Sequence, residues 1–92
     1  VFVDPFTNSM IICNRGANNI LRWGFGQSEW TLIAGSSTGT SGNSSQLFRA
    51  PSMALLDVLG NMYVADDQNH RVQFFPSASA DGITIAGESG VL

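Results

Sequence analysis

The fold class that this sequence predicts is all-β, built from two copies of one unit, and three observations predict it. Short apolar runs recur along the chain and are separated by connections rich in Gly, Asn, Asp, Ser and Pro, which are the residues that form turns. No segment shows the sustained period of an amphipathic helix. The third observation is an internal repeat over nearly the whole chain, which is typical of repeat architectures.

The repeat has a spacing of 52 positions over most of its length and 53 at its start. One extra residue in the first copy accounts for the difference, and it falls in the turn Pro5 to Ser9. Turns absorb such insertions and strands do not, so the gap lies where a true repeat would place it. The matched segments are Val1–Asp4 with Ala54–Asp57, Met10–Asn14 with Met62–Asp66, and Thr31–Gly35 with Ile83–Gly87.

Each copy is expected to hold four short antiparallel strands. The clearest prediction is the hairpin at residues 60–75, in which two apolar runs flank a polar turn. We expect a single domain over residues 1–92, with a first unit at about 1–35, a connection at about 36–52 and a second unit at about 53–87. Ser36 to Ser45 could pass for a flexible linker; we expect a long loop, because Gln46 to Pro51 regains apolar anchors. The expected strands are Val1–Val3, Met10–Cys13, Asn19–Trp23, Trp30–Ala34, Met53–Leu56, Met62–Ala65, Arg71–Phe75 and Ile83–Ala86.

Composition excludes several classes of protein. The chain has four arginines and no lysine, and its net charge of −3 argues against a nucleic-acid partner, because non-specific binding requires neutralised phosphates. No apolar run is long enough to span a bilayer, so no membrane partner is expected.

The start lacks both an initiator Met and a signal peptide, which suggests a piece of a longer chain. Cys13 is the only cysteine, so no internal disulfide can form, and we expect it to be a small buried strand residue.

The strands are apolar on both faces, since neither Met10–Cys13 nor Met62–Ala65 alternates. Strands of this kind are buried on both sides, which a lone four-stranded sheet cannot achieve. Four strands per unit at a period near 50 predict the stacked blades of a β-propeller. We expect the outer faces to carry strand residues such as Ile11, Ile20, Tyr63 or Phe74, although the sequence does not tell which of these point outward. Such faces require either further blades or self-association.

The second copy resembles the NHL repeat, a β-propeller family named for its Asn-His-Leu motif. Gly60–Asp66, followed by Asn69-His70-Arg71-Val72, is similar to the core of that repeat, and Ala50-Pro51 with Met53–Asp57 is similar to its opening. The first copy departs from the pattern, with Ala17-Asn18-Asn19 in the tripeptide position and Asn14 in place of the acidic residue. The resemblance implies two blades of a six-bladed propeller, so three copies of the chain would complete a ring. It says little about function, because one fold serves many activities.

Asp66 and Asp67 are adjacent carboxylates with two possible roles. A carboxylate pair can perform acid–base chemistry, but we expect Asp66 to cap the hairpin turn by accepting backbone N–H groups, with Asn14 doing the same in the first copy. His70 and Arg71 lie at the family's namesake position, which implies a role in the turn and in packing between blades. A metal site there would need further histidines or carboxylates.

Two tryptophans and two arginines complete the candidates. Trp23 and Trp30 flank the turn Gly24 to Glu29; an exposed pair could stack on a sugar or a peptide, but we expect them to pack in the core. Arg22 and Arg49 are expected to be solvated or to bridge neighbours, where an ion pair contributes little.

We expect a non-catalytic scaffold that binds a protein or glycan ligand through loops on one rim, because a propeller fixes its blades and displays its loops. The alternative is a fragment of a propeller enzyme, of the lyase or lactonase type, with a metal site in its channel. That site needs several histidines, and the chain has only His70, so we expect no catalytic residue, no metal and no cofactor. The sequon Asn43-Ser44-Ser45 would matter only in an extracellular protein. The candidate binding residues on the rim are Arg15, Asn18, Arg49, Asp67 and Gln68.

Overall fold

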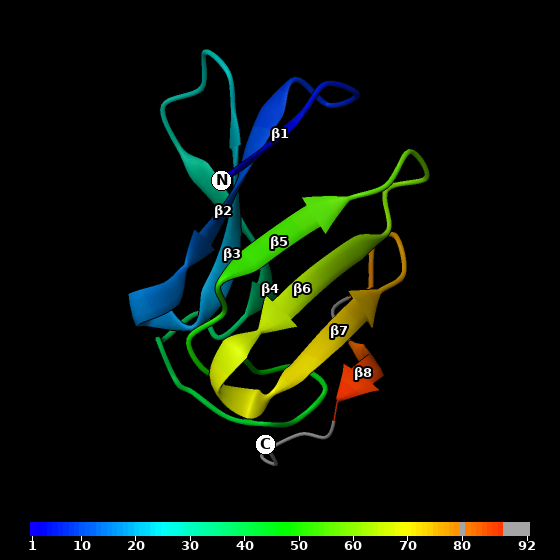
Figure 1. Ribbon diagram of the computed structural model, residues 1–92. Coiled ribbons are helices and arrows are strands. Elements are labelled where there is room, and N and C mark those ends of the chain that lie inside the picture. Colours follow the sequence, from blue (N-terminus) through cyan, green and yellow to red (C-terminus); the bar gives the residue numbers. More distant parts are fainter. Residues whose placement is uncertain (80, 88–92) are drawn as a thin grey trace.

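The computed structural model describes residues 1–79 and 81–87, which form two four-stranded antiparallel sheets (Figure 1). The strands follow chain order within each sheet, so the predicted all-β fold with two similar sheets is confirmed. The first sheet contains β1 (Phe2–Asp4), β2 (Ser9–Asn14), β3 (Asn19–Gly24) and β4 (Trp30–Gly35). The second contains β5 (Met53–Leu56), β6 (Met62–Asp66), β7 (Arg71–Phe75) and β8 (Ile83–Gly87). Two single-turn 3₁₀ helices, η1 (Arg15–Ala17) and η2 (Asp67–Asn69), lie in the β2–β3 and β6–β7 turns.

The two copies match in their backbone irregularities as well as in their strands. Each 3₁₀ turn ends on a left-handed residue, Asn18 at φ 58° and His70 at φ 56°. Each fourth strand ends on a glycine with positive φ, Gly35 or Gly87. A β-carbon on either glycine would collide with the carbonyl oxygen of the left-handed residue opposite, so only glycine fits there.

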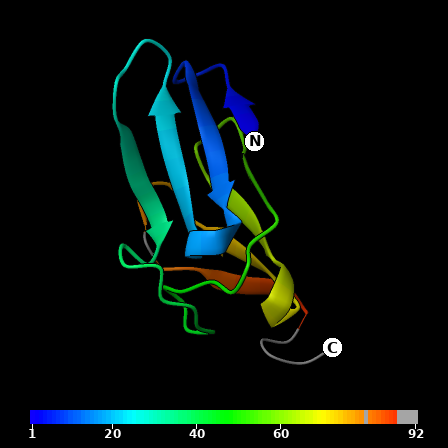
Figure 2. The same cartoon turned by 90° about the vertical axis from the view of Figure 1, so that its left-hand side faces the viewer.

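The two sheets pack face to face and bury an apolar core between them (Figure 2). β1 and β2 of the first sheet make the main contacts with β5 of the second. The connection at residues 36–52 adds Phe48, whose ring is fully buried and lies 5.6 Å from that of Phe75 between centroids. The apolar anchors expected in this connection are therefore present. The fully formed core consists of Ile11, Ile20, Ala34, Phe48, Ala54, Met62, Val64 and Phe75.

The structure separates the four candidates for the outer faces, which the sequence could not do. Ile11 and Ile20 are 1% and 0% exposed and lie in the core. Tyr63 and Phe74 do lie on the open face of the second sheet, where their rings meet edge to face at 5.1 Å. The non-alternating sequence of Met10 to Cys13 gave no means of telling the two faces apart.

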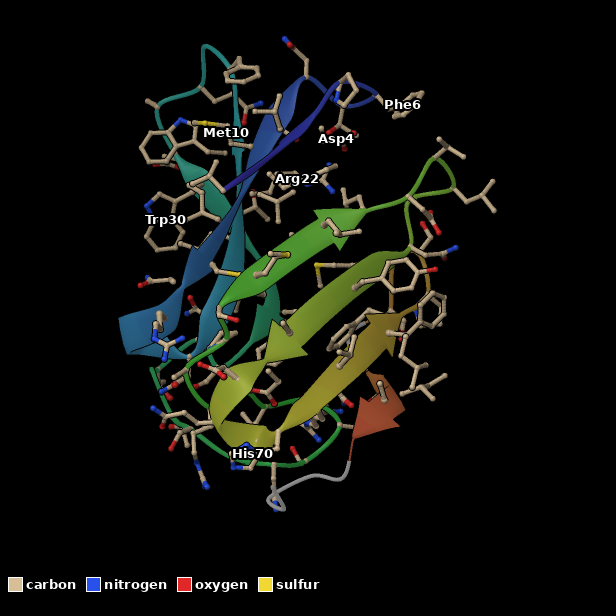
Figure 3. All side chains as sticks on the ribbon, viewed as in Figure 1. Asp4, Phe6, Met10, Arg22, Trp30 and His70 are labelled. Carbon is tan, nitrogen blue, oxygen red and sulfur yellow. The ribbon has the colours of Figure 1, made fainter. Side chains whose placement is uncertain are left out.

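Both open faces of the molecule are apolar, and Figure 3 labels Met10 and Trp30 of the first sheet's open face. Cross-strand partners share a face, so the register assigns each residue to one side. The open face of the first sheet carries Val3, Met10, Ile12, Leu21, Trp23, Trp30 and Leu32, and that of the second carries Met53, Leu55, Tyr63, Ala65, Val72, Phe74 and Ile83.

The expected continuation of the repeat after Gly87, residues 88–92, lies outside the described residues. In the described part of the chain no helix is long and apolar enough to cross a membrane.

Candidate functional site

The rim that carries both 3₁₀ turns brings together all five of the predicted binding residues. Arg15 Nη2 lies 3.1 Å from Asp67 Oδ2, and Arg15 Nη1 donates to the carbonyl oxygen of Ala50 at 3.1 Å. The backbone N–H of Gln68 donates to the carbonyl oxygen of Arg49 at 3.1 Å. The turns of both sheets and the connection between them therefore form one continuous surface.

These five side chains are not equally available to a ligand. Both ends of the Asn18 amide are engaged, since Nδ2 donates to the carbonyl of Gly39 and Oδ1 accepts the N–H of Ala50, each at 2.9 Å. Arg15 and Asp67 are half exposed but pair with each other. Arg49 and Gln68 are exposed and contribute only backbone atoms to the bonds of the rim, so their side chains are the ones that face solvent.

Asp66 does not cap its own hairpin turn, and that prediction was wrong. Its carboxylate is fully buried, and it makes no capping bond to η2. Oδ1 accepts the N–H of Arg49 at 2.7 Å, while Oδ2 accepts Asn69 Nδ2 at 2.7 Å and Arg71 Nε at 2.8 Å. Asp66 therefore holds the incoming connection. Its neighbour Asp67 faces solvent with a different partner, so the two carboxylates do not form an acid–base pair.

Arg71 is the second half of this buried anchor. Its guanidinium donates to the carbonyl oxygens of Asn43, Ser44 and Leu47 at 2.8 to 2.9 Å, and the residue is only 6% exposed. The expected role in the turn fits His70, whose backbone N–H donates to the carbonyl oxygen of Asp67 and closes η2, while its role in packing between blades stays a prediction. The expected role in the turn does not describe Arg71, which fastens the connection to the second sheet. A signal existed in the sequence, because Asp66 and Arg71 face each other across the hairpin.

The tryptophans and the cysteine also differ from expectation. Trp30 is 54% exposed and lies beside Trp23 on the open face of the first sheet, so the expected core packing is wrong for this pair. Trp23 Nε1 donates to the carbonyl of Gln27 at 2.8 Å. Cys13 is only half-buried on the inner face. Burial raises the pKa of its thiol, and the chain's amino-terminal charge opposes that shift in part.

Several exposed apolar side chains at the opposite rim were missed by sequence reasoning. They lie at the tips of the β1–β2, β3–β4 and β5–β6 turns and are 45% to 75% exposed. The signal was visible, because turn tips are ordinarily polar or glycine-rich. These residues are Phe6, Phe25, Val58 and Leu59.

Within residues 1–79 and 81–87, no group of three or more His, Cys, Asp or Glu side chains is arranged to hold a metal ion. Comparison of the chain with family models, curated proteins and solved structures finds no match. The resemblance to the NHL repeat therefore stays a prediction from the sequence.

Proposed function

We propose that the two sheets are neighbouring blades of an NHL-type β-propeller and that the chain is a non-catalytic scaffold. The observation that carries this proposal is that the two copies bury opposite faces. The first sheet turns Ile11 and Cys13 inward, whereas the second turns Met62 and Val64 inward. Met62 and Val64 correspond to Met10 and Ile12, which lie on the open face of the first sheet.

Each repeat therefore packs against its successor with one face and offers the other face to its predecessor. The open face of the first sheet corresponds to the inner face of the second, and the reverse also holds. The two open faces are consequently the two halves of the interface already present inside the molecule. Contiguous apolar surfaces of this kind mark interaction sites, and repeat units need neighbours on both sides for stability.

For the 92-residue chain alone, the occupant of each open face is a second copy of the chain. Phe2 and Leu56 pack against the core between the sheets. Their repeat counterparts are Leu55 and Val3, which are 38% and 54% exposed on the two open faces. Leu55 of one copy would meet Val3 of the next, in a head-to-tail contact that three copies close into the six-bladed ring that the resemblance implies. In a longer parent chain, further repeats would fill the same positions.

The test uses two variants that each spoil one half of this contact, Val3→Glu and Leu55→Glu. The wild-type chain should associate at micromolar concentration in sedimentation velocity, and each variant alone should be monomeric. An equimolar mixture of the two variants should form a dimer, because each retains the half that the other has lost.

Two results would overturn the stacking proposal. One is a folded wild-type chain that remains monomeric across the concentration range. The other is association of the wild-type chain with no dimer in the mixture, because identical faces would then be paired. Circular dichroism of each variant confirms that the fold is retained.

The rim is the proposed ligand-binding surface of this scaffold. Arg15, Asn18, Arg49, Asp67 and Gln68 combine both signs of charge with amides, which suits the polar groups of a protein or glycan. The described rim residues contribute no lysine, and the net charge of −3 disfavours RNA.

A panel of neutral and acidic oligosaccharides together with an immobilised peptide library would test this surface. The double variant Arg49→Ser/Gln68→Ser should lose the ligand that the wild-type chain binds, because it removes two exposed rim side chains that form none of the bonds described within the rim. Gln27→Ser, in the β3–β4 turn of the opposite rim, is the matched control and should bind normally. Absence of any bound ligand, or equal binding by the double variant, would contradict the proposal.

A further inference from the structure

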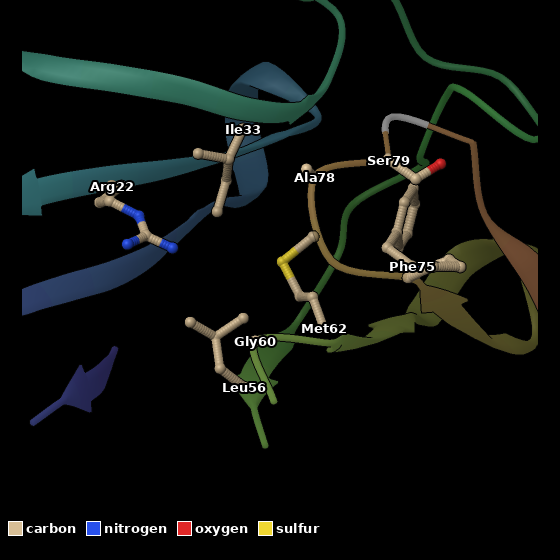
Figure 4. Close-up of a pocket in the computed structure, with 9 residues that line it drawn as sticks. Arg22, Ile33, Leu56, Gly60, Met62, Phe75, Ala78 and Ser79 are labelled. Carbon is tan, nitrogen blue, oxygen red and sulfur yellow. The ribbon is translucent and has the colours of Figure 1, made fainter. Parts of the chain in front are cut away.

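A cavity of about 230 Å³ lies between the two sheets, on the side of the core where the β5–β6 and β7–β8 turns meet the first sheet (Figure 4). Its walls are mainly apolar, and Met62 and Phe75 are 4% and 2% exposed. It is smaller than the usual pocket for a drug-sized molecule, so it suits a small ligand. The residues that matter for its chemistry are Arg22, Ile33, Leu56, Met62, Phe75 and Ser79.

Arg22 is the one cationic side chain among the residues that line this cavity. It faces Ile11 across β2 and β3 and therefore lies on the inner face of the first sheet. Figure 4 shows its guanidinium reaching from β3 into the space in front of Leu56 and Met62. Its repeat counterpart is Phe74, which lies on the open face of the second sheet, so the positive charge on the inner face is a feature of the first copy and not of the repeat.

No hydrogen bond or ion pair joins the Arg22 guanidinium to any described residue. Asp4 lies on the same face of the sheet, but its oxygens are already engaged by the N–H of Phe6 at 3.1 Å and the hydroxyl of Thr7 at 2.5 Å. A half-buried guanidinium among apolar walls has lost part of its hydration without gaining a partner. The planar fork of arginine matches a carboxylate, which it binds through two parallel hydrogen bonds.

We propose that this cavity binds a small monocarboxylate with an apolar body. The Arg22 guanidinium holds the carboxylate, and Leu56, Met62 and Phe75 surround the hydrocarbon part. A phosphate fits less well, because a dianion would require more donors than one arginine and would leave the apolar walls unused. The inference does not depend on the stacking proposal, since the cavity lies between faces that are internal to one chain.

The chain carries three methionines, and their methyl resonances allow a direct test of ligand binding in the cavity. Met62 lines the cavity, whereas Met10 and Met53 lie on the two open faces. With ¹³C-methyl methionine, titration of benzoate should shift the Met62 methyl resonance in a saturable manner and leave the other two unchanged. Benzyl alcohol, which has the same ring without the charge, should bind at least about tenfold more weakly, as expected for the loss of a charge-assisted pair.

Variants distinguish a specific contact between Arg22 and the carboxylate from a general effect of the protein's net charge. Arg22→Gln should weaken benzoate binding by about tenfold or more, and Arg22→Lys, which keeps the charge but lacks the fork, should give an intermediate loss. Glu29→Gln changes the net charge by the same single unit at an exposed position of the β3–β4 turn, and it should bind benzoate as the wild type does. The proposal fails if Met62 does not respond to benzoate, if benzyl alcohol binds equally well, or if Glu29→Gln changes benzoate binding as much as Arg22→Gln does. Should Arg22→Gln not fold, Arg22→Lys and the alcohol still decide between these outcomes.

Discussion

The β2–β3 and β6–β7 turns have the same backbone and different chemistry. Both contain a single 3₁₀ turn closed by a left-handed residue. In the first sheet, Asn19 donates to the carbonyl of Ser36 at 2.8 Å, just beyond the end of its own β4. In the second sheet, the corresponding Arg71 pairs with buried Asp66 and holds the incoming connection through three carbonyls. The shape of the turn thus depends on backbone geometry, and its side chains decide what the turn anchors.

Removing the anchor should have the largest effect of any change considered. Arg71→Met leaves Asp66 buried without its counter-ion and should lower the free energy of unfolding by about 3–5 kcal/mol, which is enough to unfold a small domain. Asn19→Ala, at the matching position of the first sheet, should cost about 1 kcal/mol, the worth of one hydrogen bond. Urea unfolding followed by circular dichroism measures both.

A double variant sharpens this contrast. Asp66→Asn/Arg71→Met carries no unpaired buried charge, so it should recover part of the stability lost in Arg71→Met. If Arg71→Met and Asn19→Ala are equally destabilising, the buried pair does not distinguish the two turns.

The left-handed residues should respond in opposite directions to glycine. His70→Gly relieves the strain of a positive φ and should stabilise the fold by about 0.5–1 kcal/mol. Asn18→Gly relieves the same strain but loses two hydrogen bonds to the connection, with Gly39 and Ala50, so it should be destabilising by about 1 kcal/mol. Thermal unfolding of the two variants side by side would show the opposite signs, and a stabilised Asn18→Gly would mean that its bonds are not needed.

Arg15 and Asp67 occupy the same repeat position in the two turns and pair across them. Both side chains are about half exposed, so solvent screens their attraction. A double-mutant cycle with Arg15→Gln and Asp67→Asn should give a coupling of about 0.2–1 kcal/mol, which should shrink as salt is added. A coupling that is insensitive to salt would indicate contacts beyond the ion pair.

The smallest effect is expected at Asp57, in the β5–β6 turn. Partial desolvation raises the pKa of this carboxyl, but hydrogen bonds from Asn61, Leu59 and Tyr63 outweigh it and leave the pKa below its usual value. A lowered pKa in the folded state stabilises the fold above the unfolded pKa of about 3.9, and that contribution is lost as pH falls through the folded value. Asp57→Asn should therefore slightly flatten the acid side of a plot of the free energy of unfolding against pH, measured by urea unfolding at a series of pH values.

The strands were predictable because apolar runs, turn residues and the repeat all indicated the same boundaries, which the structure moves by no more than one residue at each end. Which face of each strand is buried could not be predicted, because neither Met10–Cys13 nor Met62–Ala65 alternates and because the two copies bury opposite faces. The candidate residues could be placed on one rim because successive turns of an antiparallel sheet lie at alternate ends of its strands. The pairing of Asp66 with Arg71 could have been inferred from their opposite positions in the predicted hairpin. The anchoring of the connection could not, because the acceptors of Arg71 are backbone carbonyls 24 to 28 residues away, and backbone acceptors have no sequence signature.

The burial of opposite faces has a consequence for how the two copies can change over evolutionary time. A position such as Ile11 is interior, while its counterpart Tyr63 lies on an open face. The same substitution therefore alters the core in one copy and the surface in the other, so selection acts on the two copies differently. Recombination that made the copies identical would put interior residues on a surface. The two copies already differ at such positions, with arginine at position 22 on an inner face and phenylalanine at position 74 on an open face.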